Sequence, residues 1–169
     1  MAITARFSTL YRLAFLALVA IAWTSGGSFF ALDTWVTVEG EFGPEKHPWQ
    51  TDILRVHGAT AFLMMISFGA ILSAHVPAGW RARSMRASGV VVITVVSLLV
   101  ITAWLLYYLG DEGIRRIVTF VHLGLGLSLP VVLWIHLRRS ARRRRRAKHR
   151  SKAVHAPSTR EASCARPLE

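Results

Sequence analysis

The sequence has almost no cysteine, and its long apolar runs have almost no charge. Cys164 is the single cysteine in 169 residues. A lone thiol excludes an internal disulfide, a CxxC metal site and covalent attachment of a cofactor through a CxxCH motif. Asp, Glu and Lys are absent from four apolar runs, which cover about residues 10–32, 53–76, 87–109 and 117–137. Uncharged runs of this length are unusual in soluble domains and common in small membrane proteins.

The four runs have the length of membrane-spanning helices. A helix needs about 20 apolar residues to cross a hydrocarbon core of about 30 Å, and each run has roughly that many. We therefore predict an all-α fold, an integral membrane four-helix bundle formed by residues 1–137. An alternative for the first run is a signal peptide preceded by Arg6 and Arg12, although the run is longer than the usual apolar region of such peptides.

The charged residues predict how the bundle is oriented. Arginines lie between the second and third runs and in the tail RRSARRRRRAKHR. Acidic residues lie in the other two connections: Asp33, Glu39, Glu41, Glu45, Asp52, Asp111 and Glu112. The positive-inside rule places both termini in the cytoplasm. Residues 138–169 are basic and poor in large apolar side chains, so we predict a disordered tail. Attraction to anionic membrane lipid explains the tail better than nucleic-acid binding.

Two of the runs carry a histidine at each end. The second contains HGATAFLMMISFGAILSAH, from His57 to His75, and the fourth contains HLGLGLSLPVVLWIH, from His122 to His136. A histidine within a membrane span is costly and suggests a functional site. Spacings of 18 and 14 residues put each pair on one helical face. Because both helices run from outside to inside, His57 is predicted to meet His122, and His75 to meet His136.

Two imidazoles facing each other inside a bundle are the ligands that a six-coordinate haem iron requires. Gly58, Gly69, Gly124 and Gly126 lie beside or between the histidines and leave room for a macrocycle. An alternative is that these small residues let membrane helices pack closely, and that the histidines are interfacial anchors. The two histidine pairs span about 27 Å and 21 Å of helix. Different helix tilts, a kink near Pro130 and different side-chain reach would absorb this mismatch, and the alternative is that one pair is not a ligand pair.

The sequence resembles the four-helix, di-haem b-type cytochromes of prokaryotic membranes, which include the haem-b subunits of formate dehydrogenases and nickel hydrogenases. The resemblance covers roughly residues 8–140 and rests on the two histidine segments quoted above and on WLLYYLG at the end of the third run. It implies two non-covalent b haems held by His57, His75, His122 and His136 in a prokaryotic plasma membrane. It also implies electron transfer between a quinone, or another redox partner, and a further protein. Unlike several small members, the chain has no histidine in its first run.

Bis-histidine ligation leaves no open iron position, so the resemblance implies an electron-transfer subunit rather than a complete enzyme, with a hetero-oligomer as one possible state. Arginines at the helix ends are candidates for pairing haem propionates, with simple interfacial anchoring as the alternative: Arg55, Arg81, Arg83, Arg115, Arg116 and Arg138. The outer loop around Trp35 and Trp49 is either a docking site for a basic partner or an ordinary connection.

Two other classes of protein remain open. One is a non-haem structural or assembly subunit of a membrane complex. The other is a metal carrier, which the sequence favours less, since Met64 and Met65 are adjacent and face different sides and no carboxylate is near the histidines.

Overall fold

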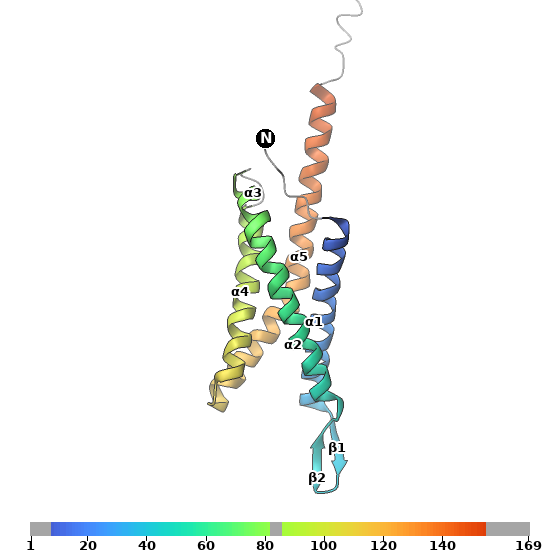
Figure 1. The fold of residues 1–169 in the computed structure, drawn as a ribbon, viewed down its shortest axis with the longest axis vertical. Coiled ribbons are helices and arrows are strands. Elements are labelled where there is room, and N and C mark those ends of the chain that lie inside the picture. The colour runs from blue at the N-terminus through green and yellow to red at the C-terminus, as the bar shows by residue number, and fades with distance from the viewer. Residues whose placement is uncertain (1–7, 82–85, 155–169) are drawn as a thin grey trace, which may run out of the picture.

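The computed structural model describes residues 8–81 and 86–154. In this part of the chain, all of the secondary structure is helical apart from one short β-hairpin (Figure 1). The elements in chain order are α1 (Thr9–Trp35), β1 (Thr37–Gly40), β2 (Gly43–Lys46), α2 (Trp49–Ala70), the π-helical turn η1 (Ile71–His75), α3 (Val76–Arg81), α4 (Arg86–Tyr108) and α5 (Glu112–Val154).

Polar side chains cap two of the long helices. The Ser8 hydroxyl accepts a hydrogen bond from the Tyr11 backbone N–H at 3.2 Å, at the start of α1. The Asp111 carboxylate accepts one from the Ile114 N–H at 2.8 Å, at the start of α5. Both caps satisfy donors that the first helical turn leaves unpaired, and the Asp111 charge also complements the helix dipole. These polar caps fix where the apolar segments begin.

The four long helices pack in two antiparallel pairs, α1 with α2 and α4 with α5 (Figure 1). Val19 of α1, Val96 of α4 and Leu129 and Leu133 of α5 form a buried apolar cluster that joins the two pairs. Met64 and Phe68 of α2 pack against this cluster, so all four helices contribute to one core.

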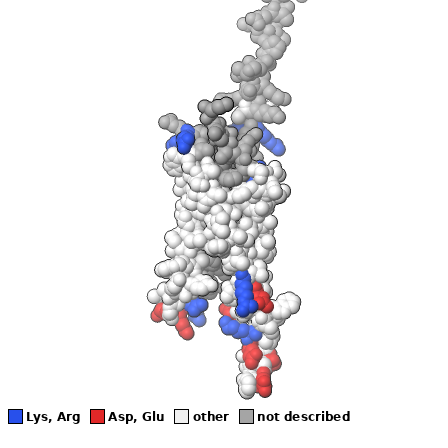
Figure 2. Space-filling view, in the orientation of Figure 1, with Lys and Arg blue, Asp and Glu red and all other residues white. Residues whose placement is uncertain are grey.

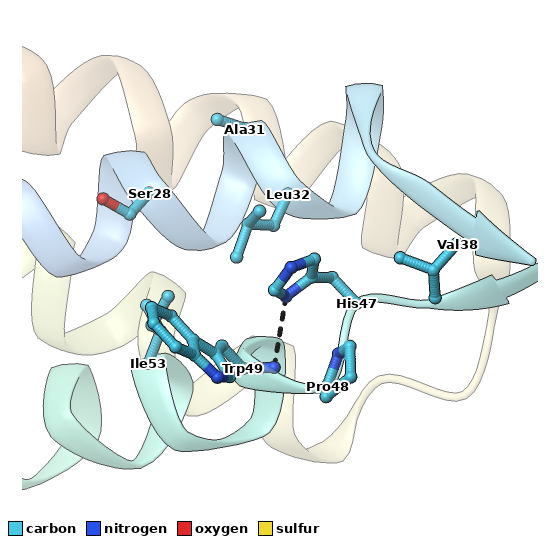
Figure 3. A pocket seen from close by; sticks show the side chains of 8 residues that line it. All are labelled: Ser28, Ala31, Leu32, Val38, His47, Pro48, Trp49 and Ile53. Carbon is cyan, nitrogen blue, oxygen red and sulfur yellow. Dashed lines mark hydrogen bonds between the residues drawn. The ribbon is translucent and has the colours of Figure 1, made fainter.

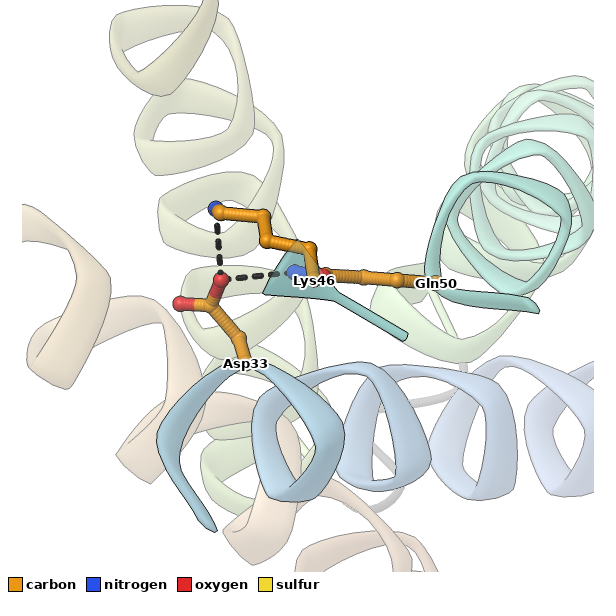
Figure 4. A network of polar contacts seen from close by, with 3 residues as sticks. All are labelled: Asp33, Lys46 and Gln50. Carbon is orange, nitrogen blue, oxygen red and sulfur yellow. Dashed lines mark hydrogen bonds and ion pairs between the residues drawn. The ribbon is translucent and has the colours of Figure 1, made fainter. Parts of the chain in front are cut away.

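The outer connection between α1 and α2 folds as an antiparallel β-hairpin with Thr37 opposite Lys46 and Gly40 opposite Gly43. Gly43 has φ +117°, which glycine adopts at little steric cost. At the base of the hairpin, Asp33 of α1 accepts hydrogen bonds from Lys46 Nζ at 2.9 Å and from Gln50 Nε2 of α2 at 2.6 Å (Figure 4). This network ties the hairpin to both helices.

The outside of the helix pairs is apolar between two charged ends. Large apolar side chains such as Phe62, Ile66, Ile101 and Ile117 are mostly exposed. Figure 2 shows a band without charged side chains, arginine and lysine near one end, and acids mixed with bases near the other. Four helices of the described chain are long and apolar enough to cross a membrane: Thr9–Trp35, Trp49–Ala74, Arg86–Tyr108 and Glu112–Ala147. The prediction of an all-α fold with four helices long and apolar enough to span a membrane is confirmed.

Two features of the helices differ from the sequence-based expectation. Helix α5 continues to Val154, whereas disorder was predicted from Arg138 onward. Once a long helix is nucleated, arginine, lysine and alanine extend it at little cost, which explains the continuation. Residues 155–169 of the predicted tail lie outside the described residues. The π-helical turn η1 interrupts the regular α-helical phase between His57 and His75. The 18-residue spacing alone therefore does not place these two histidines on one helical face.

Candidate functional site

His57 lies on α2 and points toward α1. Its Nδ1 is 3.0 Å from the Ala22 carbonyl oxygen and 3.3 Å from the Ser25 hydroxyl oxygen. The ring also lies against Gly26, where an added Cβ would come within 2.8 Å of His57 Cε1. A residue larger than glycine at position 26 therefore requires the imidazole to move.

His122 lies on α5 and points toward α4. Its Nδ1 is 2.8 Å from the hydroxyl oxygen of Thr102, a side chain that is buried in the structure. The same hydroxyl lies 2.8 Å from the Leu98 carbonyl oxygen and 3.1 Å from the Leu99 carbonyl oxygen. Each histidine is thus held by the antiparallel partner helix of its own pair.

The contact with Ala22 determines the tautomer of His57. A carbonyl oxygen only accepts hydrogen bonds, so His57 Nδ1 must carry the proton that reaches Ala22. The same tautomer of His122 results when the Thr102 hydroxyl donates its hydrogen to the Leu98 carbonyl and its oxygen accepts from His122 Nδ1–H. In both imidazoles Nε2 is then the unprotonated nitrogen, which is the form that binds a metal. Neither Nε2 makes a hydrogen bond to the residues that the structure describes.

The two rings face each other across the boundary between the helix pairs. The ring centroids of His57 and His122 are 6.3 Å apart and the ring planes are nearly perpendicular, at 84°. Both side chains are half-buried. The structure therefore brings together two imidazoles, each anchored at Nδ1, from helices that are distant in the sequence.

The inner histidines are described less completely. His136 of α5 has its Nδ1 3.1 Å from the Ser88 hydroxyl oxygen of α4, which repeats the arrangement of His122 and Thr102. His75 closes the π-helical turn η1. Its side chain lies outside the described residues, so the predicted pair of His75 and His136 stays a prediction. Single π-helical turns inside α-helices are frequent at functional sites.

The four glycines predicted at the site are not held in tight contacts. A Cβ added at Gly58, Gly69 or Gly124 would meet no atom within 4 Å, and one at Gly126 would only touch Leu99 at 4.0 Å. Close helix packing therefore does not explain the absence of side chains at these positions. Their assignment to a cofactor stays a prediction, and the open space is compatible with it.

Two of the arginines suggested for propionates have other partners. Arg55 forms an ion pair with Asp52 at 3.0 Å, and the guanidinium of Arg138 lies 4.1 Å from the ring centre of Trp134. Both contacts resemble ordinary interfacial anchoring. Arg83 lies outside the described residues.

The residues that hold the histidines were not predicted from the sequence. They are Ala22, Ser25 and Gly26 on α1 and Ser88 and Thr102 on α4. A signal was present, because Ser88 and Thr102 are 14 residues apart, the same spacing as His122 and His136 on the antiparallel neighbour. Ser25, Ser88 and Thr102 are also three of the five buried polar residues in the described chain. The Ala22 contact uses a backbone oxygen, which every residue type has, so it could not be predicted from the sequence.

No cluster in residues 8–81 and 86–154 combines three or more His, Cys, Asp or Glu side chains in a geometry that could hold a metal ion. The candidate site thus offers two protein ligands rather than a complete coordination shell. Comparisons with protein-family models, with curated proteins and with solved structures found no match for this chain.

Proposed function

We propose that this chain is a b-type membrane cytochrome that transfers electrons across the bilayer. His57 and His122 would hold one haem toward the acidic end, and His75 and His136 a second haem toward the arginine-rich end. The observation that carries the proposal is the facing pair of His57 and His122, with both Nδ1 atoms in hydrogen-bonding contact with a neighbouring helix.

The separation of the two rings fits one metal between them. An imidazole nitrogen binds a transition metal at about 2 Å and the ring centre lies about 1 Å further, so two opposed ligands place their ring centres about 6 Å apart. The observed centroid distance is 6.3 Å. Anchoring of the second ring nitrogen is also the usual arrangement of metal-binding histidines, because it orients the ring and raises its basicity.

The small number of ligands favours haem over a bare metal ion. A protein zinc site uses three or four side chains, and the described residues offer no such cluster. A porphyrin supplies four nitrogen ligands itself and needs only two axial groups, which is what the facing pair offers. The open space at Gly58 and Gly124, next to and near the two histidines, also suits a large flat group.

A haem with two histidine ligands supplies one-electron transfer without an open site for oxygen. The role of the chain is then to hold the ligands at fixed positions, to exclude water with the Val19 and Leu129 cluster, and to tune ligand basicity through Ala22 and Thr102. This is the function of an electron-transfer subunit, with a quinone or a redox protein as donor or acceptor.

The distribution of charge supports the proposed orientation. Arg81, Arg86 and the arginines after Leu137 lie at the end of the bundle where α1 begins, and the β-hairpin acids lie at the opposite end (Figures 1 and 2). Under the positive-inside rule, both termini face the cytoplasm and the hairpin faces outward in a prokaryotic plasma membrane.

The proposal is tested by purifying the full chain in detergent from haem-replete cells. We expect a b-type α-band in the reduced-minus-oxidised spectrum, and two haems per chain by extraction. His57→Ala should remove one haem, and His149→Ala, which changes an exposed histidine of α5 outside the facing pair, should remove none.

A folded preparation that binds no haem would contradict the proposal and favour the non-haem structural or assembly subunit. One haem per chain that survives His57→Ala would contradict the outer site while keeping the inner one.

A further inference from the structure

A groove between α1, α2 and the β-hairpin is not used by the facing histidine pair. Its outer part is a cavity of about 770 Å³ lined by Ser28, Ala31, Leu32, Val38, His47, Pro48, Trp49 and Ile53 (Figure 3). A second cavity of about 370 Å³ shares Ser28, Trp49 and Ile53 with it and continues inward to Ile21, Ser25 and Val56. Ligand-binding cavities usually enclose about 300–1,000 Å³, so the groove is large enough for a small molecule.

The mouth of the groove presents the imidazole of His47 as a hydrogen-bond donor, beside the Ser28 hydroxyl and the Trp49 indole N–H that also line it. His47 Nδ1 accepts from the Trp49 backbone N–H at 3.2 Å, so this nitrogen is unprotonated and Nε2 carries the proton. Figure 3 shows the His47 ring turned toward Leu32 and Trp49, inside the lining. Its Nε2–H makes no hydrogen bond to the residues that the structure describes. The Asp33 network with Lys46 and Gln50 holds the segment on either side of His47 in place.

The groove runs from the expected membrane surface into the apolar layer. Trp35 and Trp49 are largely exposed near its mouth, and exposed tryptophans concentrate at the level of lipid head groups and esters. From Leu32 to Ile21 the lining follows α1 for about 16 Å. The inner part is continuous with the apolar outer face of α1 and α2 that a membrane must cover.

A long groove with hydrogen-bond donors at its interfacial end suits a ligand that has a hydrogen-bond acceptor at one end and a long apolar chain at the other. We infer that it binds a phospholipid of the outer leaflet, with an ester carbonyl accepting from His47 Nε2–H and an acyl chain lying between α1 and α2. The acyl chain reaches the level of Ser25, whose hydroxyl contacts His57 Nδ1. A bound lipid thereby supports the α1 segment that positions His57, but lipid binding itself does not depend on the proposed haem.

The test compares lipid retention by variants of the full chain. Protein exchanged into mild detergent is titrated with dioleoylphosphatidylethanolamine, and complexes are counted by native mass spectrometry. We expect one tightly bound phospholipid for the wild type. Ala31→Trp, which fills the outer cavity, should abolish it, whereas Ala20→Trp, the same change at an exposed position on α1 outside both cavities, should leave it intact. His47→Phe should weaken binding about fivefold, the value of one hydrogen bond.

The inference is overturned if the wild type retains no more phospholipid than Ala31→Trp. It is also overturned if the retained molecule lacks an ester carbonyl, as a quinone does. His47→Phe keeps the groove open, so it tests the donor even if Ala31→Trp misfolds. Because no step in this measurement involves haem, its failure is distinct from failure of the proposed electron transfer.

Discussion

The helix pair α1–α2 and the helix pair α4–α5 present one histidine each to the same boundary, yet they anchor it by different means. In the first pair, His57 is held mainly by the backbone carbonyl of Ala22, with the Ser25 hydroxyl slightly farther away. In the second pair, the shortest contact of His122 is the one at 2.8 Å between its Nδ1 and the Thr102 hydroxyl oxygen, and the Leu99 backbone is a further partner of the ring. A backbone acceptor survives most substitutions, and a side-chain acceptor does not.

The two pairs also differ in how the ring is seated. His57 lies against Gly26, where no side chain fits, while the glycines near His122 have open space in front of them. The α1–α2 pair therefore fixes its histidine by shape and by a backbone oxygen, whereas in the α4–α5 pair the Thr102 hydroxyl makes the closest contact. Substitutions at these positions should affect haem binding to different degrees.

Removing either imidazole has the largest effect. His122→Ala and His57→Ala should each lower haem content by one per chain, since the outer site loses an axial ligand. Haem extraction with protein quantification checks this, and His149→Ala, in the arginine-rich part of α5, serves as the control. Different losses for the two variants would show that the histidines do not share one haem.

Filling the space at Gly26 should have the second largest effect on haem binding. Gly26→Ala should displace the His57 ring and weaken binding of the outer haem by at least about tenfold, a typical cost of disturbing a ligand's support. Gly27→Ala is the matched control, because a Cβ there meets nothing within 4 Å. Haem titration of the haem-free protein measures the affinity of both variants. Equal haem affinities would contradict the placement of the His57 ring against Gly26.

Removing the Thr102 hydroxyl should change the midpoint potential and the affinity of the outer haem. Thr102→Val keeps the size of the side chain but leaves His122 Nδ1–H without its acceptor, which lowers the basicity of the ring. We expect the midpoint potential of the outer haem to rise and its affinity to fall roughly 10-fold. Redox titration checks this, and Thr102→Ser should restore the wild-type value. A potential that does not move would argue that the hydroxyl only packs.

Ser25→Ala should have the smallest effect. The Ala22 carbonyl stays in place at 3.0 Å from His57 Nδ1, so the ring keeps its tautomer. We expect less than about a threefold change in haem affinity, against the larger loss for Thr102→Val. If the two changes were equally harmful, the contrast between backbone and side-chain anchoring would be wrong.

Much of the fold was predictable because it follows from local properties. Four apolar runs of sufficient length gave four helices close to the expected bounds, and Ser8 and Asp111 cap two of them. The β-hairpin at 37–46 was not predicted, since Glu, Gly and Lys are weak strand formers and its pairing depends on a turn at Gly43. The extension of α5 was missed because the basic, apolar-poor composition after Leu137 indicated disorder, whereas the preceding helix continues through arginine, lysine and alanine at little cost.

Hydropathy, length and charge are properties of each segment alone, so apolar helices with histidines at matched ends could be predicted without a structure. The packing of the helices was needed to show that the rings of His57 and His122 lie 6.3 Å apart and that Ala22 and Thr102 contact their Nδ1 atoms. Those contacts join helices distant in the chain, and one of them uses a backbone oxygen. Their physical basis is the relative rotation and depth of packed helices, which arises from the shared core rather than from any single segment.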